Sequence, residues 1–137
     1  MVRIAPGRAE VVDEVPSGVL YVDGGVLTPA NSAQIRERRH VAANGALMVA
    51  VTLDKRGKLA ADITVKALGL PGDDEYPLNE ALDDLAEDAE DAVGALKGDA
   101  RDDDRAVEQA VGRALKRSAQ RIWDRRPAVE TLVTRVG

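Results

Sequence analysis

The sequence contains no cysteine, no phenylalanine and a single histidine, His40. Without cysteine it cannot form disulfides, thiolate nucleophiles or cysteine-based metal sites. One histidine cannot build the multi-histidine centre of a hydrolytic metal enzyme, and Ser17, Ser32 and Ser118 lie in no recognisable triad motif. The residues therefore offer no catalytic or metal-binding group, and we expect no cofactor in this chain and no enzymatic activity of the chain alone.

Aromatic residues are almost as scarce, since the chain holds only Tyr21, Tyr76 and Trp123. Stacking platforms of the RRM or OB type are therefore not expected, and Trp123 is assigned to the core.

No apolar run approaches the roughly 20 residues that span a membrane, and no signal-peptide pattern precedes the first charged residues. We expect a cytoplasmic protein without a membrane partner.

Charge, in contrast, is abundant and unevenly distributed. The 137 residues are 45% hydrophobic and 31% charged, which is typical of one folded domain with a single core. Residues 73–104 hold fourteen acidic and two basic side chains, a local charge of −12, and the remainder carries +7. An acidic band repels nucleic-acid phosphates and a basic surface attracts them, although both are also typical of solvated helix faces.

Residues 1–35 are rich in turn signals, among them Pro6-Gly7 and Pro16-Ser17-Gly18, with two β-like runs at 8–12 and 18–24. Two isolated strands are marginal in water, so we expect them to pair with a segment outside this chain. On this interpretation we expect Met1 to be an engineered start within a longer protein. We interpret 1–35 as the tail of a preceding domain with a linker, and 36–137 as a second domain.

Residues 46–53 and 58–68 alternate apolar and other side chains on either side of a "DKRG" turn, which predicts a β-hairpin. Leu47, Val49 and Val51 share one face and are expected in the core. The opposite face is small and mostly uncharged, which suits close packing against a second copy of the chain. The candidate residues of this assembly face are Thr52, Ala60, Thr64 and Leu68.

Two amphipathic helices are predicted after the hairpin. The first covers 78–96 with Asn79 as its cap, and the second begins at 102–104 and stops before Pro127. A third strand over 128–136 completes the order β-β-α-α-β. The chain is therefore predicted to be an α+β protein, a two-layer sandwich of a small three-stranded sheet with two helices on one face, preceded by short extra β-strands.

The stretch "RERRHVAANG" at 36–45 places three arginines and the histidine ahead of the first apolar strand. It is either a phosphate-binding site or a charged lead-in, and we interpret it as a linker that ends in a turn at Asn44-Gly45. A second basic group shares one sector of the second helix. The candidate RNA-phosphate contacts in the two groups are Arg36, Arg38, Arg39, Arg113, Lys116, Arg117 and Arg121.

The run "YVDGGVLTPANSAQIRERRHVAANGALMVAVTLDKRGKLAADITVKALG" at 21–69 resembles the junction and C-terminal domain of bacterial ribonuclease J. The shared features are the arginine-rich lead-in, the Asn44-Gly45 turn before a valine-rich strand, and "LDKRGKL" at 53–59. "WDRRP" at 123–127 and the valine-rich last strand also match. Members of that family join a metallo-β-lactamase fold and a β-CASP insertion to a small β-β-α-α-β domain.

The resemblance implies an RNA-degrading parent that uses zinc or another divalent metal and whose catalytic core would be this domain's first partner. The family's metal site has no counterpart in these residues. In that family the domain supports subunit assembly and activity. Two functions stay open: a module that forms a homodimer or higher assembly, and an accessory domain that binds RNA through its second helix. A ligand-sensing domain of similar shape is a third, for which no pocket signature is visible.

Overall fold

The computed structural model describes residues 2–5, 8–12, 19–23, 26–29 and 32–137. Met1 and the turns predicted at Pro6-Gly7 and Pro16-Ser17-Gly18 lie outside the described residues. The chain divides into two compact units, which we call unit 1 (Met1–Ala42) and unit 2 (Ala43–Gly137).

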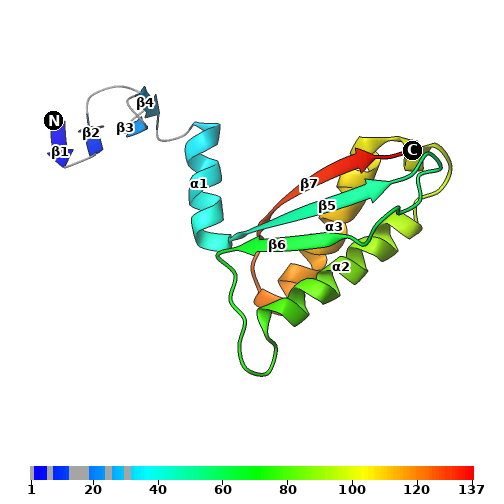
Figure 1. The fold of residues 1–137 in the computed structure, drawn as a ribbon. Coiled ribbons are helices and arrows are strands. Elements are labelled where there is room, and N and C mark those ends of the chain that lie inside the picture. Colours follow the sequence, from blue (N-terminus) through cyan, green and yellow to red (C-terminus); the bar gives the residue numbers. More distant parts are fainter. Residues whose placement is uncertain (1, 6–7, 13–18, 24–25, 30–31) are drawn as a thin grey trace. The chain divides into compact units, whose positions relative to one another are not determined.

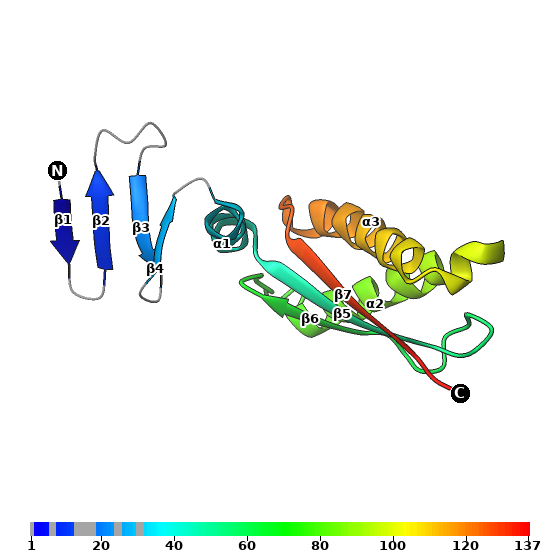
Figure 2. The same cartoon turned by 90° about the horizontal axis from the view of Figure 1, so that it is seen from above.

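Unit 1 contains four short strands that form one antiparallel sheet in the order β1-β2-β3-β4 (Figure 2). The predicted strands are present as β2 (Arg8–Val12) and β3 (Val19–Asp23), and they are flanked by β1 (Val2–Ala5) and β4 (Val26–Pro29). The expectation that the two predicted strands need partners from outside the chain is wrong, because each pairs on both sides with a strand of the chain itself.

The segment that we interpreted as a charged linker is helical instead, since α1 spans Ala33–Asn44. Alanine, glutamine, glutamate and arginine have high helix propensity, but no apolar stripe marks the segment, so its periodicity did not predict a helix. The turn predicted at Asn44-Gly45 is confirmed as the end of this helix, where Gly45 has a left-handed φ of 80°.

Unit 2 contains a hairpin, two helices and a last strand. In chain order its elements are β5 (Ala46–Leu53), β6 (Thr64–Leu68), α2 (Leu78–Gly94), the short 3₁₀ helix η1 (Gly98–Asp102), α3 (Asp104–Trp123) and β7 (Ala128–Arg135). The sheet runs β6-β5-β7, with β5 antiparallel to β6 and parallel to β7. Figure 1 shows α3 behind the strands and α2 along β6, and both helices bury side chains in one cluster with β5, so the predicted β-β-α-α-β sandwich is confirmed.

The core of unit 2 lies between the sheet and the two helices. Leu47, Val49, Val51 and Leu53 of β5 are each at most 2% exposed, and they belong to one buried cluster. The large side chains that the helices bury completely in this cluster are Leu85, Val107, Val111 and Leu115. Complete burial of a Val or Leu side chain is worth about 1.5–3 kcal/mol, so β5 and the two helices stabilise each other strongly.

The helix starts differ from the sequence expectation in one respect. Asn79 does not cap α2, because the helix begins one residue earlier and Pro77 occupies the cap position without a side-chain hydrogen bond. At α3 the predicted acidic start is a true cap, where the carboxylate of Asp103 accepts a hydrogen bond from the backbone N–H of Arg105 at 3.0 Å.

No helix among the described residues has the length and apolar character needed to cross a membrane.

The second hairpin strand is shorter than the sequence suggested. β6 begins at Thr64 instead of residue 58, and only an isolated bridge joins Leu59 to Leu53 before it. The backbone N–H of Ala60 still donates to the carbonyl oxygen of Thr52 at 2.8 Å, so Ala60 lies beside β5 but outside any strand. Alternating apolar residues alone did not reveal where regular pairing ends.

Trp123, which we expected in the core, lies at its margin. The side chain packs against the buried cluster but is only partly buried. Its indole Nε1 donates a hydrogen bond to the carbonyl oxygen of Pro71 at 2.7 Å, as an indole N–H that leaves water requires. The residue therefore ties the end of α3 to the loop before α2.

Replacing Trp123 with Ala should lower the free energy of unfolding by about 2–3 kcal/mol, less than for a completely buried Trp, because part of the ring stays in water. Trp123→Phe keeps the aromatic packing, loses the hydrogen bond and should cost about 1 kcal/mol. Urea unfolding followed by circular dichroism measures both values. Identical midpoints and slopes for the three proteins would show that the indole contributes nothing.

A second prediction concerns the glycine between α1 and β5. A Cβ on Gly45 would lie 2.8 Å from both the Leu68 carbonyl oxygen and Leu70 Cγ, whereas one on Gly98, also left-handed with a φ of 60°, would meet no atom within 4 Å. Gly98→Ala should therefore cost about 1 kcal/mol for its backbone conformation alone, and Gly45→Ala about 2–3 kcal/mol more because of overpacking. Thermal or urea unfolding of the two variants compares them, and equal losses would rule out the steric explanation.

Candidate functional site

The face of the unit 2 sheet opposite the helices is the first candidate surface, and we call it the outer face. Strand register arranges its side chains in four cross-strand rows. From β6 through β5 to β7 these are Leu68–Ala46–Ala128, Lys66–Met48–Glu130, Thr64–Ala50–Leu132, and Thr52–Thr134 without a β6 member. In a strand, alternate residues point to opposite faces, so every residue in these rows points away from the buried Leu47, Val49 and Val51.

Three large apolar side chains lie open on the outer face. Met48 is 37% exposed, Leu68 is 57% exposed and Leu132 is 73% exposed. Between them lie small residues such as Ala50 and Thr64, which are also exposed. A group of exposed apolar side chains with few charges is typical of a surface that another protein covers.

The structure brings together most of the predicted assembly residues. Thr52, Thr64 and Leu68 belong to the rows of the outer face, while Ala60 lies beside Thr52 outside the strands. Leu132, the most exposed large apolar residue in the part of the chain that the structure describes, was not predicted from the sequence to belong to this face. The alternation within 128–136 placed it on one face of a strand, but only the register with β5 shows which face that is.

The predicted RNA contacts occupy two separate helices. Arg36, Arg38 and Arg39 are exposed on α1, which belongs largely to unit 1. The remaining four are exposed on α3 of unit 2, and they are Arg113, Lys116, Arg117 and Arg121. A helix that presents several cations on one sector can follow a phosphate backbone.

The acidic helix α2 lies directly beside the basic helix α3. Arg121 forms an ion pair with Asp88 of α2 at 3.6 Å, and the same carboxylate accepts a hydrogen bond of 2.6 Å from the buried hydroxyl of Ser118. Glu87 and Asp91 lie on the α2 side of this contact. The α2 carboxylates therefore reduce the positive potential that α3 offers to a phosphate.

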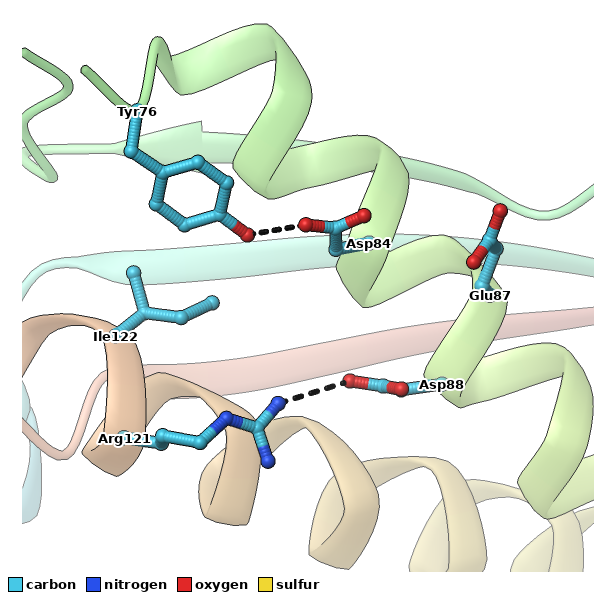
Figure 3. A pocket seen from close by; sticks show the side chains of 6 residues that line it. All are labelled: Tyr76, Asp84, Glu87, Asp88, Arg121 and Ile122. Atoms are coloured by element: carbon cyan, nitrogen blue, oxygen red, sulfur yellow. Dashed lines mark hydrogen bonds and ion pairs between the residues drawn. The ribbon is translucent and has the colours of Figure 1, made fainter.

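A hollow of about 510 Å³ lies over this helix pair (Figure 3). The Tyr76 hydroxyl donates a hydrogen bond to Asp84 on one side of it, and Arg121 points to Asp88 on the other. The pKa of Tyr76 is raised from 10.0 to about 12, mainly by partial burial and secondly by the hydrogen bond to Asp84. The hydroxyl thus stays protonated at neutral pH and cannot act there as a base. The paired groups favour a structural role for the hollow.

A catalytic metal centre does not fit the residues described. His40 is exposed on α1, apart from the carboxylate-rich α2 in the sequence. In the part of the chain that the structure describes, no group of three or more His, Cys, Asp or Glu side chains could hold a metal ion. Divalent-metal hydrolysis needs such a convergent donor set, so no catalytic step can be derived from these residues.

Comparison with known proteins gives concordant matches. The profile of the family described as "Ribonuclease J C-terminal domain" matches residues 33–136. The chain is 37% identical over 137 residues to the ribonuclease J of Sinorhizobium meliloti and 27% identical over 130 residues to that of Corynebacterium glutamicum. These alignments cover 99% and 94% of this chain but only 24% and 18% of the relatives. The chain therefore spans about a quarter or less of the curated proteins that it matches.

The raised pKa of Tyr76 predicts a stability change at alkaline pH. The native state holds this proton up to about pH 12, whereas the unfolded state releases it near 10.0, so this contribution is complete below pH 10 and is lost as pH rises through that interval. The free energy of unfolding of Tyr76→Phe should therefore fall less steeply over this interval than that of the unsubstituted chain. Urea unfolding at several pH values measures the slope, and parallel pH profiles would contradict the assignment.

Proposed function

Because the chain belongs to the ribonuclease J family, where it corresponds to the C-terminal domain, we propose that it is the non-catalytic assembly domain of an RNA-degrading enzyme. In this proposal the domain joins two or more copies of the enzyme and so supports the activity of their catalytic cores. The metal, zinc or another divalent ion, would be bound by the catalytic core. We expect the enzyme to work on RNA in the cytoplasm.

The outer face of the unit 2 sheet is the observation that carries this proposal. An antiparallel or mixed sheet can be stable with one face in water, but that face is then usually polar. Here Met48, Leu68 and Leu132 remain exposed, and the other strand residues of the face are alanines and threonines apart from Lys66 and Glu130. Covering these side chains with the same surface of a second copy removes apolar area from water on both copies, and most soluble assemblies are symmetric in this way.

The basic sector of α3 favours a second candidate, RNA binding. Arg113, Lys116 and Arg117 are exposed and lie within two helical turns, which suits phosphate contacts. Two features weigh against it as the main role. The acidic α2 lies beside α3, and Arg121 is already paired with Asp88. No aromatic platform supplements the cations. We therefore rank RNA binding second.

Analytical ultracentrifugation of the chain over a wide range of concentrations tests the proposal, in the presence and absence of a single-stranded RNA. We expect a concentration-dependent dimer, or a larger assembly, that forms without RNA and persists at high salt, because apolar burial is screened little. A monomer at every concentration, together with RNA affinity that falls with salt and is lost in Arg113→Ala/Arg117→Ala, would reverse the ranking.

A charge placed on the outer face should prevent this association. Leu132→Glu puts a carboxylate where 73% of the side chain is exposed, so folding should change by less than about 0.5 kcal/mol while self-association weakens at least about tenfold. Thr52→Lys/Thr64→Lys should act in the same way. Gln109→Glu, an added carboxylate on the exposed side of α3, is the matched control and should leave association unchanged. If Gln109→Glu weakens it as much as Leu132→Glu does, the effect reports net charge, not the face.

A further inference from the structure

The outer face carries only two charged side chains among its strand residues, Lys66 on β6 and Glu130 on β7. Both pair in register with Met48 on the central strand, so they belong to the same row of the outer face and lie on opposite sides of β5. Both are exposed. The outer face therefore has one positive and one negative side chain at the same level along the strands, with the apolar side chain of Met48 between them.

The two charges do not neutralise each other within the chain. Adjacent strands are about 4.8 Å apart, so the backbones of β6 and β7 are roughly 10 Å apart, with Met48 between them. Among the described residues, no ion pair involves Lys66 or Glu130. When an apolar surface covers a face with two unpaired charges, each charge is desolvated at a cost unless an opposite charge meets it.

A two-fold axis can bring two outer faces together in two main ways, and the charges distinguish them. An axis across the strands places β6 on β6, so Lys66 meets the Lys66 of the other copy and the carboxylates also meet. An axis along β5 places β6 of one copy over β7 of the other. Lys66 then meets Glu130 of the second copy, and the symmetry forms this pair twice.

We infer that two copies of the chain pack outer face to outer face about a two-fold axis along β5, with reciprocal pairs between Lys66 and Glu130. This inference rests on the proposed assembly function and specifies its geometry. Sheets that pack face to face are about 10 Å apart, a gap that the long side chains of lysine and glutamate can bridge from both sides. Ala46, Met48 and Ala50 lie on β5 at the axis, where the flexible Met48 side chain meets its copy and the two small alanines permit close approach.

The remaining rows are compatible with the same axis. Thr64 of one copy lies opposite Leu132 of the other, and Leu68 lies opposite Ala128, so each larger apolar side chain meets a smaller one. A contact of three strands is only about 15 Å wide. The area that it buries should therefore be smaller than that of a usual stable interface, so the isolated chain should associate weakly and reversibly. The dissociation constant is therefore a sensitive readout of single substitutions.

Charge reversal tests the geometry. Lys66→Glu gives two carboxylate–carboxylate contacts across the interface, and Glu130→Lys gives two ammonium–ammonium contacts. Each single variant should raise the dissociation constant at least about tenfold, since like charges in an interface are strongly unfavourable. The double variant Lys66→Glu/Glu130→Lys recreates both attractive pairs with reversed polarity and should return the constant toward that of the unsubstituted chain. Sedimentation velocity of the full chain at low salt measures all four proteins.

Controls separate charge effects from misfolding. Mixing the two single variants puts an all-negative face against an all-positive one, so association should return in the mixture only if both variants fold. The exposed reversals Glu108→Lys and Lys116→Glu on α3 should leave the constant unchanged. Two results would overturn the inference: single variants that associate like the unsubstituted chain, or a double variant as weak as the singles. An unsubstituted chain that never associates would instead reject the assembly function itself.

Discussion

The burial of one face of β5 beneath α2 and α3 is the interaction on which the rest of unit 2 depends. Leu47, Val49, Val51 and Leu53 are almost completely buried, and β5 is hydrogen-bonded to a strand on both sides. Since both helices occupy this one face, the other face receives no cover from unit 2 itself (Figure 1). The exposed Met48, Leu68 and Leu132 are thus a direct consequence of a two-layer arrangement with only one helical layer.

The two layers consequently present different chemistry to their surroundings. The helical layer is covered with charge, and its acidic and basic helices partly satisfy each other through Arg121 and Asp88. The outer face of the sheet is small, apolar and nearly uncharged. Charged, solvated surfaces keep a protein soluble, whereas apolar ones gain free energy when covered. In the proposed function, the sheet therefore carries the contact with a second copy, and α3 is the candidate surface for nucleic acid.

Much of the fold could be predicted from the sequence because its signals are local. The period of two in residues 46–53 and the apolar stripes of the helices follow from which side chains must be buried. Helix α1 was not predicted because its residues have helix propensity but no apolar stripe. The 73% exposure of Leu132 was not predicted because strand register is a long-range property. The row that joins Lys66, Met48 and Glu130 depends on a parallel pairing between residues about eighty positions apart in the chain, which no local pattern encodes.

A single cysteine tests most directly whether two copies meet through the outer face. The chain has no cysteine, so Met48→Cys introduces the only thiol. Met48 lies on β5 at the proposed axis, and its side chain is 37% exposed. Treated with a short thiol-specific bifunctional reagent, this variant should form a covalent dimer in high yield at concentrations where the chain associates. Gln109→Cys on α3 should remain monomeric. Equal yields from the two variants, or none from Met48→Cys in an associating sample, would contradict the account.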